Sequence, residues 1–278
     1  MPPSEFPGIT SAPAGAALDL ARVRAQLSTQ RLGSAFHYFQ EIDSTNTYAR
    51  KLAENGAAEG GIIIAESQSQ GRGRLGRRWE SPPFSNLYLS FILRPDLFPR
   101  HAPQITLTAA VAVAETVGAF IIRSPSIKWP NDILIDGKKL AGILSEAACD
   151  AERIEYVILG IGLNLNSHVA TMPEDLRDRA ISMADLTGAY VSRENVLVRL
   201  IQHLDRCYGD LGERGFEAIR PRWEARFGLR GRRVQVEVGG RSVVGWARGL
   251  NREGALIVED EQGQKFSIVA GDVIPLES

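Results

Sequence analysis

The sequence predicts an α+β fold in which helices flank a β-sheet and a small β-barrel follows near the C-terminus. Short apolar or β-branched runs bounded by turn residues recur between residues 60 and 166, as expected for strands. Between residues 192 and 226 the leucines and isoleucines repeat at helical spacing. After Gly228 the pattern changes to short strands with glycine-containing turns. We therefore expect a flexible N-terminal extension (1–35), a larger domain (36–228) and a small β-barrel (229–278).

The first part of the chain contains two expected helices. Residues 1 to about 15 are rich in proline, alanine, glycine and serine, which predicts disorder, and residues 16–30 have the composition of one short helix. Residues 43–46 (DSTN) offer side chains that can cap a second helix. That helix should end at the Asn55-Gly56 pair, because glycine readily adopts the left-handed conformation that stops a helix.

The middle of the chain is expected to hold most of the sheet. Strands are predicted at residues 61–66, 87–93, 127–135, 139–147 and 156–166. The Asp136-Gly137 pair is a strong hairpin signal and should join two of these strands. Residues 103–120, rich in alanine, valine and threonine, predict a helix that is buried on most sides.

The last third combines a helical pattern with short strands. The helical pattern covers residues 192 to about 226, and Pro221 should start a new turn within it. Strands are predicted at residues 234–238, 242–250, 255–259 and 266–269.

Composition excludes several classes of protein. The 278 residues carry a net charge of -1, so no overall positive field attracts nucleic acid or an anionic membrane. No apolar run reaches the roughly 18 residues that would indicate a membrane span, and the start lacks the features of a signal peptide. We therefore expect a cytoplasmic protein with no membrane partner. Cys149 and Cys207 lack metal-binding spacing and are expected to be reduced packing residues rather than catalytic thiols.

The most informative segment is residues 71–79 (GRGRLGRRW), with four arginines and three glycines. It contains the pattern G-x-G-x-x-G of dinucleotide-binding folds, which requires a helix directly after the glycines. Residues 79–86 instead hold two prolines and turn residues and lead into a strand. The dinucleotide interpretation is therefore rejected.

A solvent-exposed basic loop is the simplest alternative for this segment. Charge alone does not require three glycines, whose freedom costs entropy unless the backbone must approach a ligand or change conformation. Arginine supplies planar forks of donors for phosphate or carboxylate oxygens. The segment therefore favours a mobile loop that closes over an anion.

Two of the predicted strands carry unusual residues. Strand alternation places Lys139, Ala141 and Ile143 on one face, so Lys139 either meets an anion or is a hairpin-edge lysine in water. In the next strand Gly160 and Gly162 share a face, which suggests that a helix or a ligand lies close against the backbone there.

Several motifs, taken in order, resemble those of the bacterial biotin protein ligases. They are DSTN at 43–46, QSQGRGRLGRRW at 68–79, NLYLS at 86–90, KWPND at 128–132, KLAGILSE at 139–146 and GIGLN at 160–164. The resemblance runs from about Tyr38 to the C-terminus, and several motifs in the right order are far more specific than any one of them. It implies a mixed sheet of the class II aminoacyl-tRNA synthetase-like type and an SH3-like barrel.

This family makes biotinyl-5′-AMP from biotin and ATP with release of pyrophosphate, and then transfers biotin to a lysine of a carrier domain. The resemblance implies biotin and ATP as substrates, Mg²⁺ on the triphosphate, and a biotin carboxyl carrier domain as the protein partner of a monomer or homodimer. About 36 residues precede the match, and their Pro- and Ala-rich composition predicts no DNA-binding module and no DNA partner.

The resemblance assigns residues position by position. Lys139 and Arg74 are expected to be catalytic, since fixed cations must offset the charge when a carboxylate meets the α-phosphate. The expected biotin-binding residues are Ser44, Thr45, Asn46, Gln68, Arg72, Gly73, Arg74, Lys139, Gly142, Gly160 and Gly162. The expected nucleotide-binding residues are Arg72, Arg74, Arg77, Trp79, Asn131, Lys139 and Asn164. No metal ligand is assigned.

Some of the implied roles have alternatives. Trp79 would form an aromatic wall to the adenine or the biotin chain, or else pack in the core. Asn131 and Asp132 would lie near the metal or form a structural turn, and Asp132 is a candidate proton acceptor for the attacking lysine. The flat face of Gly160 and Gly162 would leave space for the fused rings of biotin.

Two other functions compete with the ligase. A lipoate or octanoyl transfer enzyme has a similar fold, but the octanoyl enzymes need a catalytic cysteine, and neither Cys149 nor Cys207 sits in a matching motif. A non-enzymatic module that grips DNA or a phosphoprotein is disfavoured by the near-neutral charge.

Overall fold

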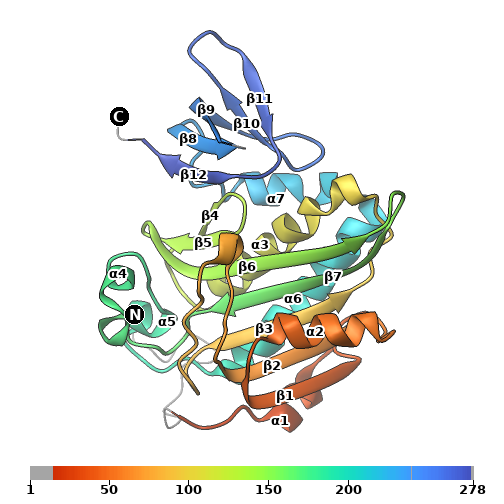
Figure 1. The fold of residues 1–278 in the computed structure, drawn as a ribbon. Coiled ribbons are helices and arrows are strands. Elements are labelled where there is room, and N and C mark those ends of the chain that lie inside the picture. The colour runs from red at the N-terminus through yellow and green to blue at the C-terminus, as the bar shows by residue number, and fades with distance from the viewer. Residues whose placement is uncertain (1–14, 239, 277–278) are drawn as a thin grey trace.

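The structure is a computed structural model that describes residues 15–238 and 240–276. Two β-sheets organise these residues, and the smaller sheet sits at one end of the larger one (Figure 1). The expected disorder at the start of the chain falls on residues 1–14, which lie outside the described part. None of the described helices combines the length and the apolar composition needed to cross a membrane.

Seven strands form the larger sheet in the order β1-β2-β3-β7-β6-β5-β4. Their bounds are β1 Ala35–Ile42, β2 Gly61–Gln68, β3 Leu87–Leu93, β4 Ser126–Lys128, β5 Asp132–Ile135, β6 Lys138–Cys149 and β7 Ile154–Leu163. Strands β1 and β2 are parallel, and the other neighbouring pairs are antiparallel. The sheet is therefore mixed, as the resemblance implies.

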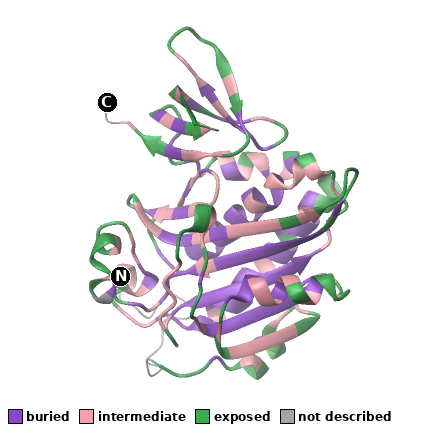
Figure 2. Cartoon of the chain, in the orientation of Figure 1, coloured by how far each residue is buried: buried purple, intermediate pink, exposed green. Residues whose placement is uncertain are grey.

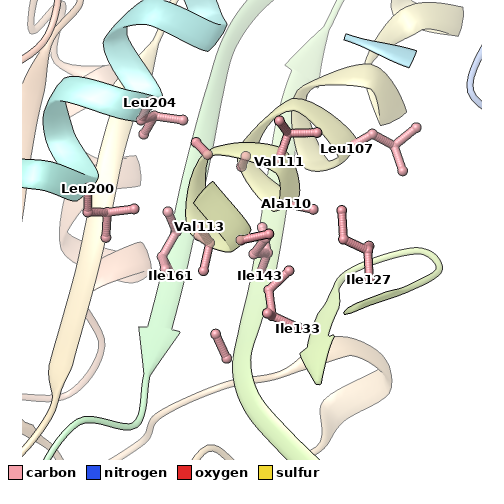
Figure 3. Close-up of a cluster of buried hydrophobic side chains, with 14 of the residues drawn as sticks. Leu107, Ala110, Val111, Val113, Ile127, Ile133, Ile143, Ile161, Leu200 and Leu204 are labelled. Carbon is pink, nitrogen blue, oxygen red and sulfur yellow. The ribbon is translucent and has the colours of Figure 1, made fainter. Parts of the chain in front are cut away.

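Helices α3 (Pro103–Gly118) and α6 (Arg193–Arg214) cover one face of this sheet. Helix α3 is apolar nearly all round because it lies between the strands and α6. Figure 3 shows the resulting core, in which Val113 of α3, Leu200 of α6 and Ile161 of β7 belong to one cluster.

Helix α2 (Thr45–Glu54) packs on the opposite face, against β2, β3 and β7. The alternation of β2 supports both layers: Ile62 and Ile64 join the core under α3 and α6, whereas Ile63 joins a smaller cluster with Ala49 and Ala53 of α2. As the connection between parallel strands β1 and β2, α2 begins at the same end of the sheet where β2 ends (Figure 1).

A buried ion pair ties the start of α6 to the sheet. Glu66 of β2 and Arg193 are 0% and 1% exposed, and Glu66 Oε1 also accepts hydrogen bonds from Leu18 N at 2.8 Å and Tyr38 Oη at 2.6 Å. Breaking such a pair leaves a buried charge uncompensated, so these contacts fix the segment before α1 (Leu20–Gln26) on the molecule.

Five antiparallel strands form the smaller sheet in the order β11-β10-β9-β8-β12. They are β8 Arg233–Val238, β9 Arg241–Leu250, β10 Leu256–Glu259, β11 Lys265–Ile268 and β12 Asp272–Pro275. Gln104 Nε2 of α3 donates to Arg252 O at 3.1 Å, which fastens this unit to the larger sheet and its helices. Figure 2 shows the buried residues concentrated in the central strands and the exposed residues in the outer hairpin of the small sheet.

The strand predicted at 127–135 is wrong as a continuous element. Residues 129–131 form a turn, and β4 and β5 pair with each other across it. Pro130 cannot donate to a strand ladder, which explains the interruption. The hairpin predicted at Asp136-Gly137 is confirmed, with both residues at positive φ, 50° and 80°.

Several elements were not expected. The helix predicted at 16–30 is reduced to α1, and β1 and β12 were missed. Short helical turns complete the fold: η2 Arg74–Gly76, η3 Pro99–His101, η4 Val169–Thr171, α4 Glu174–Arg177, α5 Met183–Thr187, η5 Phe216–Ala218 and α7 Arg220–Glu224.

Candidate active site

A cavity of about 840 Å³ opens on the α2 side of the larger sheet, where β6 begins and β7 ends. Its walls come from the start of α2, residues 72–80, strands β6 and β7, residues 172–180, and β12 of the small sheet. All of the predicted site residues line this cavity. They are Ser44, Thr45, Asn46, Gln68, Arg72, Gly73, Arg74, Arg77, Trp79, Asn131, Lys139, Gly142, Gly160, Gly162 and Asn164. The fold therefore brings together residues that are up to 120 positions apart in the sequence.

One end of the cavity is a neutral polar wall. Gln68 Oε1 accepts from Thr45 N at 2.9 Å and lies 3.1 Å from Thr45 Oγ1, which donates to it. Ser90 Oγ donates to Asn46 Oδ1 at 2.6 Å. Ser44 is the N-cap residue of α2, but its side chain makes no capping hydrogen bond, contrary to the expectation from DSTN. Its hydroxyl is therefore not committed to the helix.

Gly160 provides the floor beneath this wall. A Cβ atom at Gly160 would lie 2.3 Å from Asn46 Oδ1, which real Cβ atoms do not tolerate. The backbone of β7 therefore has to be bare for Asn46 to lie flat on it. The sequence left open whether a helix or a ligand lies against this glycine face. At Gly160 it is Asn46, a residue of helix α2.

Trp79 covers the second glycine. A Cβ atom at Gly162 would lie 2.4 Å from Trp79 Cε2, and one at Gly142 would lie 2.8 Å from Trp79 Cζ3. The expectation of open space above Gly162 is thus wrong, because the indole of the arginine-rich segment fills it. Lys139 Nζ lies 5.3 Å from the centre of the same ring, within range of a cation–π contact.

Lys139 reaches the cavity because β6 contains a bulge. The register with β5 pairs Leu134 with Lys139 but Ile133 with Ala141, so one extra residue of β6 is inserted at Leu140. Strict alternation, which placed Lys139 on the face of Ala141 and Ile143, is therefore wrong. Its Nζ lies instead beside Gly142, at 3.2 Å from the position of an added Cβ.

The ammonium group of Lys139 faces Asp132. The distance from Nζ to Asp132 Oδ1 is 2.7 Å, although this oxygen is not aligned for a hydrogen bond. The contact is therefore an ion pair with spare hydrogen-bonding capacity on both groups. Lys139 is not a free hairpin-edge lysine in water, since it pairs with Asp132 and lies over Trp79.

Three of the four arginines of residues 71–79 pair with a carboxylate of β6 or β12. Arg72 Nη2 lies 3.3 Å from Glu146 Oε2, and Arg74 Nη1 lies 3.6 Å from Asp272 Oδ1. Arg77 also pairs with Asp272. The segment is therefore held between β6 on one side and β12 on the other. An anionic ligand would compete with these carboxylates for the guanidinium groups.

Two buried polar atoms in the cavity have no hydrogen-bond partner among the described residues, Trp79 Nε1 and Asp132 Oδ1. Buried polar atoms without partners are rare in folded proteins, because each one costs desolvation free energy. Together with the neutral wall and the cations, they indicate a ligand with a neutral polar head and an anionic group a short distance away.

Sequence reasoning missed the contributions of Glu146, Asp272 and residues 172–180. Residues 172–180 are attached to the site through Lys139, whose N–H donates to Arg179 O at 2.7 Å and whose carbonyl accepts from Ile181 N at 3.0 Å. Asp272 belongs to a strand that was not predicted. Only Glu146 carried a signal, since it ends the KLAGILSE motif.

No dedicated metal cage is formed by the described residues, since no group of three or more His, Cys, Asp or Glu side chains is placed to hold an ion. The cavity does contain carboxylates, of which Asp132 has a buried oxygen without a hydrogen bond. This donor set suits Mg²⁺, which is commonly bound by one or two carboxylates together with the phosphates of a substrate.

The two cysteines lie outside the cavity lining. Cys149 is exposed, and Cys207 is buried in α6, where burial raises the pKa of its thiol to about 11 despite the nearby Arg222. A thiol with a raised pKa is a poor nucleophile. Cys207 therefore acts as a packing residue.

Comparisons with known proteins agree with this geometry. Residues 38–164 match the biotin/lipoate A/B protein ligase family, and residues 230–274 match the biotin protein ligase C-terminal domain. The chain is 36% identical over 256 residues to the bifunctional ligase/repressor BirA of Bacillus spizizenii, covering 92% of this chain and 78% of the relative.

It is also 36% identical to the biotin--[acetyl-CoA-carboxylase] ligase of Mycobacterium tuberculosis, covering 85% of this chain and 87% of that protein. Among solved structures, the biotin protein ligase of Aquifex aeolicus in complex with biotin and ATP superposes with a TM-score of 0.75 at 28% identity. That superposition covers 88% of this chain and 100% of the other.

Proposed function

Because the chain belongs to the biotin protein ligase family, we infer that it is an ATP-dependent ligase that attaches biotin to protein. The observation that carries this assignment is the single cavity with a neutral amide wall at Asn46 and Gln68 and cations at Lys139, Arg72 and Arg74. Biotin has a ureido head that pairs with neutral polar groups and a carboxylate that needs cations. The cavity therefore offers partners for both groups of this molecule.

The first reaction joins two anions. The biotin carboxylate oxygen forms a bond to the α-phosphorus of ATP, the bond to the β-phosphate oxygen breaks, and pyrophosphate leaves. Lys139 and Arg74 are proposed to offset the negative charge that grows on the phosphorus oxygens, since fixed cations in a water-excluded site act most strongly there. Arg72 and Gly73 are proposed to lie along the acyl-phosphate.

The second reaction releases AMP. A neutral lysine amine of the acceptor protein attacks the acyl carbon, an amide bond forms, and the bond from the acyl carbon to the phosphate oxygen breaks. Asp132 is proposed to accept the proton of the amine, because its carboxylate lines the cavity beside Lys139. Trp79 is proposed to shield the mixed anhydride from water and to contact the adenine.

The nucleotide half is proposed to include Arg77, Asn131 and Asn164. Asn131 holds Arg74 in place, since its Oδ1 accepts from Arg74 Nη1 at 3.2 Å while its Nδ2 donates to Ile143 O at 2.9 Å. Mg²⁺ is proposed to accompany ATP, with Asp132 as the protein carboxylate nearest to the cations. It would neutralise the triphosphate charge.

The protein partner is proposed to be a biotin carboxyl carrier domain that docks at the rim of the cavity. The rim presents two exposed apolar side chains, Leu75 at the tip of η2, 74% exposed, and Ile274 of β12, 49% exposed. Any protein that inserts a lysine into the cavity has to cover this rim. A second copy of the chain is the other candidate to cover Leu75 and Ile274. Self-association and carrier docking would therefore compete for the same rim.

The assignment is tested by pyrophosphate release from ATP with biotin, lipoate or octanoate, followed by labelling of a carrier domain. We expect pyrophosphate release from ATP with biotin, but not with lipoate or octanoate. In Lys139→Ala the rate should fall on the order of a hundredfold, the size of a lost oxyanion donor. Lipoate-dependent release, or a Lys139→Ala rate equal to the wild-type rate, would contradict the assignment.

The rim is tested separately with Leu75→Asp. We expect the KM for the carrier domain to rise at least fivefold, because a charge replaces the apolar contact, while biotin-dependent pyrophosphate release stays within twofold of wild type. Ile122→Asp is the control, since Ile122 is 76% exposed and lies outside the cavity lining. If Leu75→Asp changed the sedimentation of the protein but not the KM for the carrier domain, the rim would be assigned to self-association instead.

A further inference from the structure

Glu146 touches both halves of the cavity without lining it. Its Oε2 lies 2.8 Å from Asn46 Nδ2 and 3.3 Å from Arg72 Nη2, and its Oε1 pairs with Arg50. Asn46 and Arg72 line the cavity, whereas Glu146 and Arg50 do not. One carboxylate outside the site therefore holds a side chain of the neutral wall and a side chain of the arginine-rich segment.

The contact with Asn46 fixes which end of its amide faces which way. Ser90 donates to Oδ1 at 2.6 Å, and Glu146 accepts from Nδ2, so the amide cannot rotate without losing both hydrogen bonds. Asn46 is 5% exposed and lies flat on Gly160. Removing the acceptor would leave a buried N–H without its charged partner, which is costly and frees the amide to turn.

The contact with Arg72 anchors the start of the arginine-rich segment. Arg72 Nη2 also donates to Thr47 Oγ1 of α2 at 3.3 Å, so the segment is held to both α2 and β6. The side chains of Arg72 and Glu146 are 39% and 23% exposed, and water screens this ion pair. The anchor is therefore weak enough for a ligand anion to draw Arg72 away.

Arg50 provides a second partner for Glu146 if the ion pair with Arg72 is broken. Two guanidinium groups share one carboxylate. If a ligand drew Arg72 away, Arg50 would still pair with Glu146. Glu146 is then not left unpaired, and its hold on Asn46 persists. The arrangement keeps the wall fixed while the segment is free to exchange partners.

We propose that Glu146 is a positioning residue that orients Asn46 for the uncharged head of the substrate and anchors Arg72 of the closing segment, thereby coupling the two halves of the cavity. The inference rests on the proposed function for the identity of the substrate. The contacts that carry it, Glu146 with Asn46, Arg50 and Arg72, do not depend on that identity.

The two contacts are separable by substitution. In Glu146→Gln the amide oxygen still accepts from Asn46, but the ion pair with Arg72 is lost, whereas Glu146→Ala loses both. For Glu146→Gln we expect the KM for biotin to stay within twofold, and trypsin to cut residues 71–78 of the ligand-free enzyme at least threefold faster. For Glu146→Ala we expect the same faster cutting and a KM for biotin raised about tenfold, the size of a lost hydrogen bond to a charged group.

Glu54→Gln is the control, because Glu54 is an exposed carboxylate of α2, the helix that carries Asn46 and Arg50, and it accepts from Tyr156 Oη at 3.4 Å. An unchanged biotin KM in Glu146→Ala, equal KM values in the Gln and Ala variants, or unchanged trypsin cutting in Glu146→Gln would overturn the proposal. Trypsin cutting requires no activity. It therefore tests the anchor even if biotin proves to be the wrong substrate and Glu146→Ala fails to fold.

Discussion

At the scale of single residues, the site depends on the absence of side chains as much as on their presence. Gly160 and Gly162 leave β7 bare, and two groups lie on it: the amide of Asn46 from α2 and the indole of Trp79 from the arginine-rich segment. Each glycine therefore sets the position of one functional side chain. Their positions in GIGLN are explained by these two contacts.

Gly160→Ala should act on the biotin side alone. The new methyl group would have to displace Asn46 Oδ1 from a distance of 2.3 Å, so the KM for biotin should rise at least tenfold while the KM for ATP stays within threefold. Overpacking should also lower the free energy of unfolding by about 1–3 kcal/mol. Steady-state pyrophosphate assays and urea unfolding measure both effects.

Gly212→Ala is the control for this experiment. Gly212 lies in α6 with no atom within 4 Å of an added Cβ, so alanine should stabilise the helix by about 0.5–1 kcal/mol and leave both KM values unchanged. If Gly160→Ala raised the KM for ATP as much as that for biotin, the assignment of Asn46 to the biotin head would be wrong.

At the scale of elements, the sequence predicted those whose side chains are buried in a regular pattern. Strand β3 is buried at each of its seven positions, and α6 presents an apolar stripe, so both were predicted. Strand β1 lies at the sheet edge with an irregular exposed pattern, and β12 has four residues including a proline. Strand β12 is too short to give a pattern, and β1 has strand-favouring aromatic residues but no regular alternation of buried and exposed positions.

The bulge in β6 is a second limit of sequence reasoning. The pattern of KLAGIL fits uninterrupted alternation, and the extra residue at Leu140 follows only from the register that β5 imposes. That one residue turns Lys139 from the core face to the cavity. A bulge beside a functional site is thus a feature that alternation rules cannot predict.

The packing of α3 on α6 contains a histidine that should make stability depend on pH. Thr116 Oγ1 donates to Ala112 O, so His203 Nδ1, at 3.1 Å, carries the proton and donates to Thr116 as a neutral ring. Burial lowers the pKa of His203 to about 4, and Arg206, Arg199 and Arg222 add to this, whereas Glu115 opposes it.

The direction of the pH effect follows from this lowered pKa. Between about pH 6.5 and pH 4 the unfolded chain binds a proton at His203 that the folded protein does not, so the free energy of unfolding falls as the pH falls. His203→Asn keeps a donor toward Thr116 but does not titrate. Urea unfolding at pH 7 and pH 5 should show a smaller loss in the variant, and parallel losses in the two proteins would refute this origin.

At the scale of the whole molecule, the small sheet completes the cavity. Asp272 of β12 pairs with Arg74 and Arg77, and Arg74 Nη2 also donates to Gly271 O at 3.1 Å. Trp129 Nε1 of the KWPND turn donates to Gly254 O at 3.5 Å. The small sheet is therefore connected to two of the predicted motifs, which is why no single residue in it looked diagnostic from the sequence.

Asp272→Asn should loosen the closing segment without unfolding the small sheet. The loss of charge removes the attraction for Arg74 and Arg77, so trypsin should cut residues 71–78 faster and more biotinyl-AMP should escape from the enzyme before transfer. The melting temperature should change by less than that of a core variant, since Asp272 is 29% exposed. Chromatography of free adenylate measures the escape.

Glu261→Gln is the matched control for Asp272→Asn, because Glu261 pairs with Arg233 at 2.6 Å in the small sheet but is 69% exposed and lies outside the cavity lining. Equal adenylate escape from both variants would mean that the small sheet acts through its general stability rather than through Asp272.

The cavity residues were predictable at this scale, because they lie in motifs that follow the same order as in the biotin protein ligases. In the structure these residues line one cavity. Asp272 and Arg179 were not predictable, because they act through contacts that exist only in the folded chain, and the motif that ends at Glu146 did not reveal its contacts with Asn46 and Arg72.

The connection from β1 to β2 starts from an edge strand of the sheet and passes through α2, which packs over β2, β3 and β7. The first turn of this same connection carries Thr45 and Asn46. A ligand that binds only the closed form lowers the population of the open form in proportion to its saturation. A bound substrate that contacts Thr45 and Asn46 should therefore hold the start of α2 in place, so hydrogen exchange in α2 should slow as biotin binds.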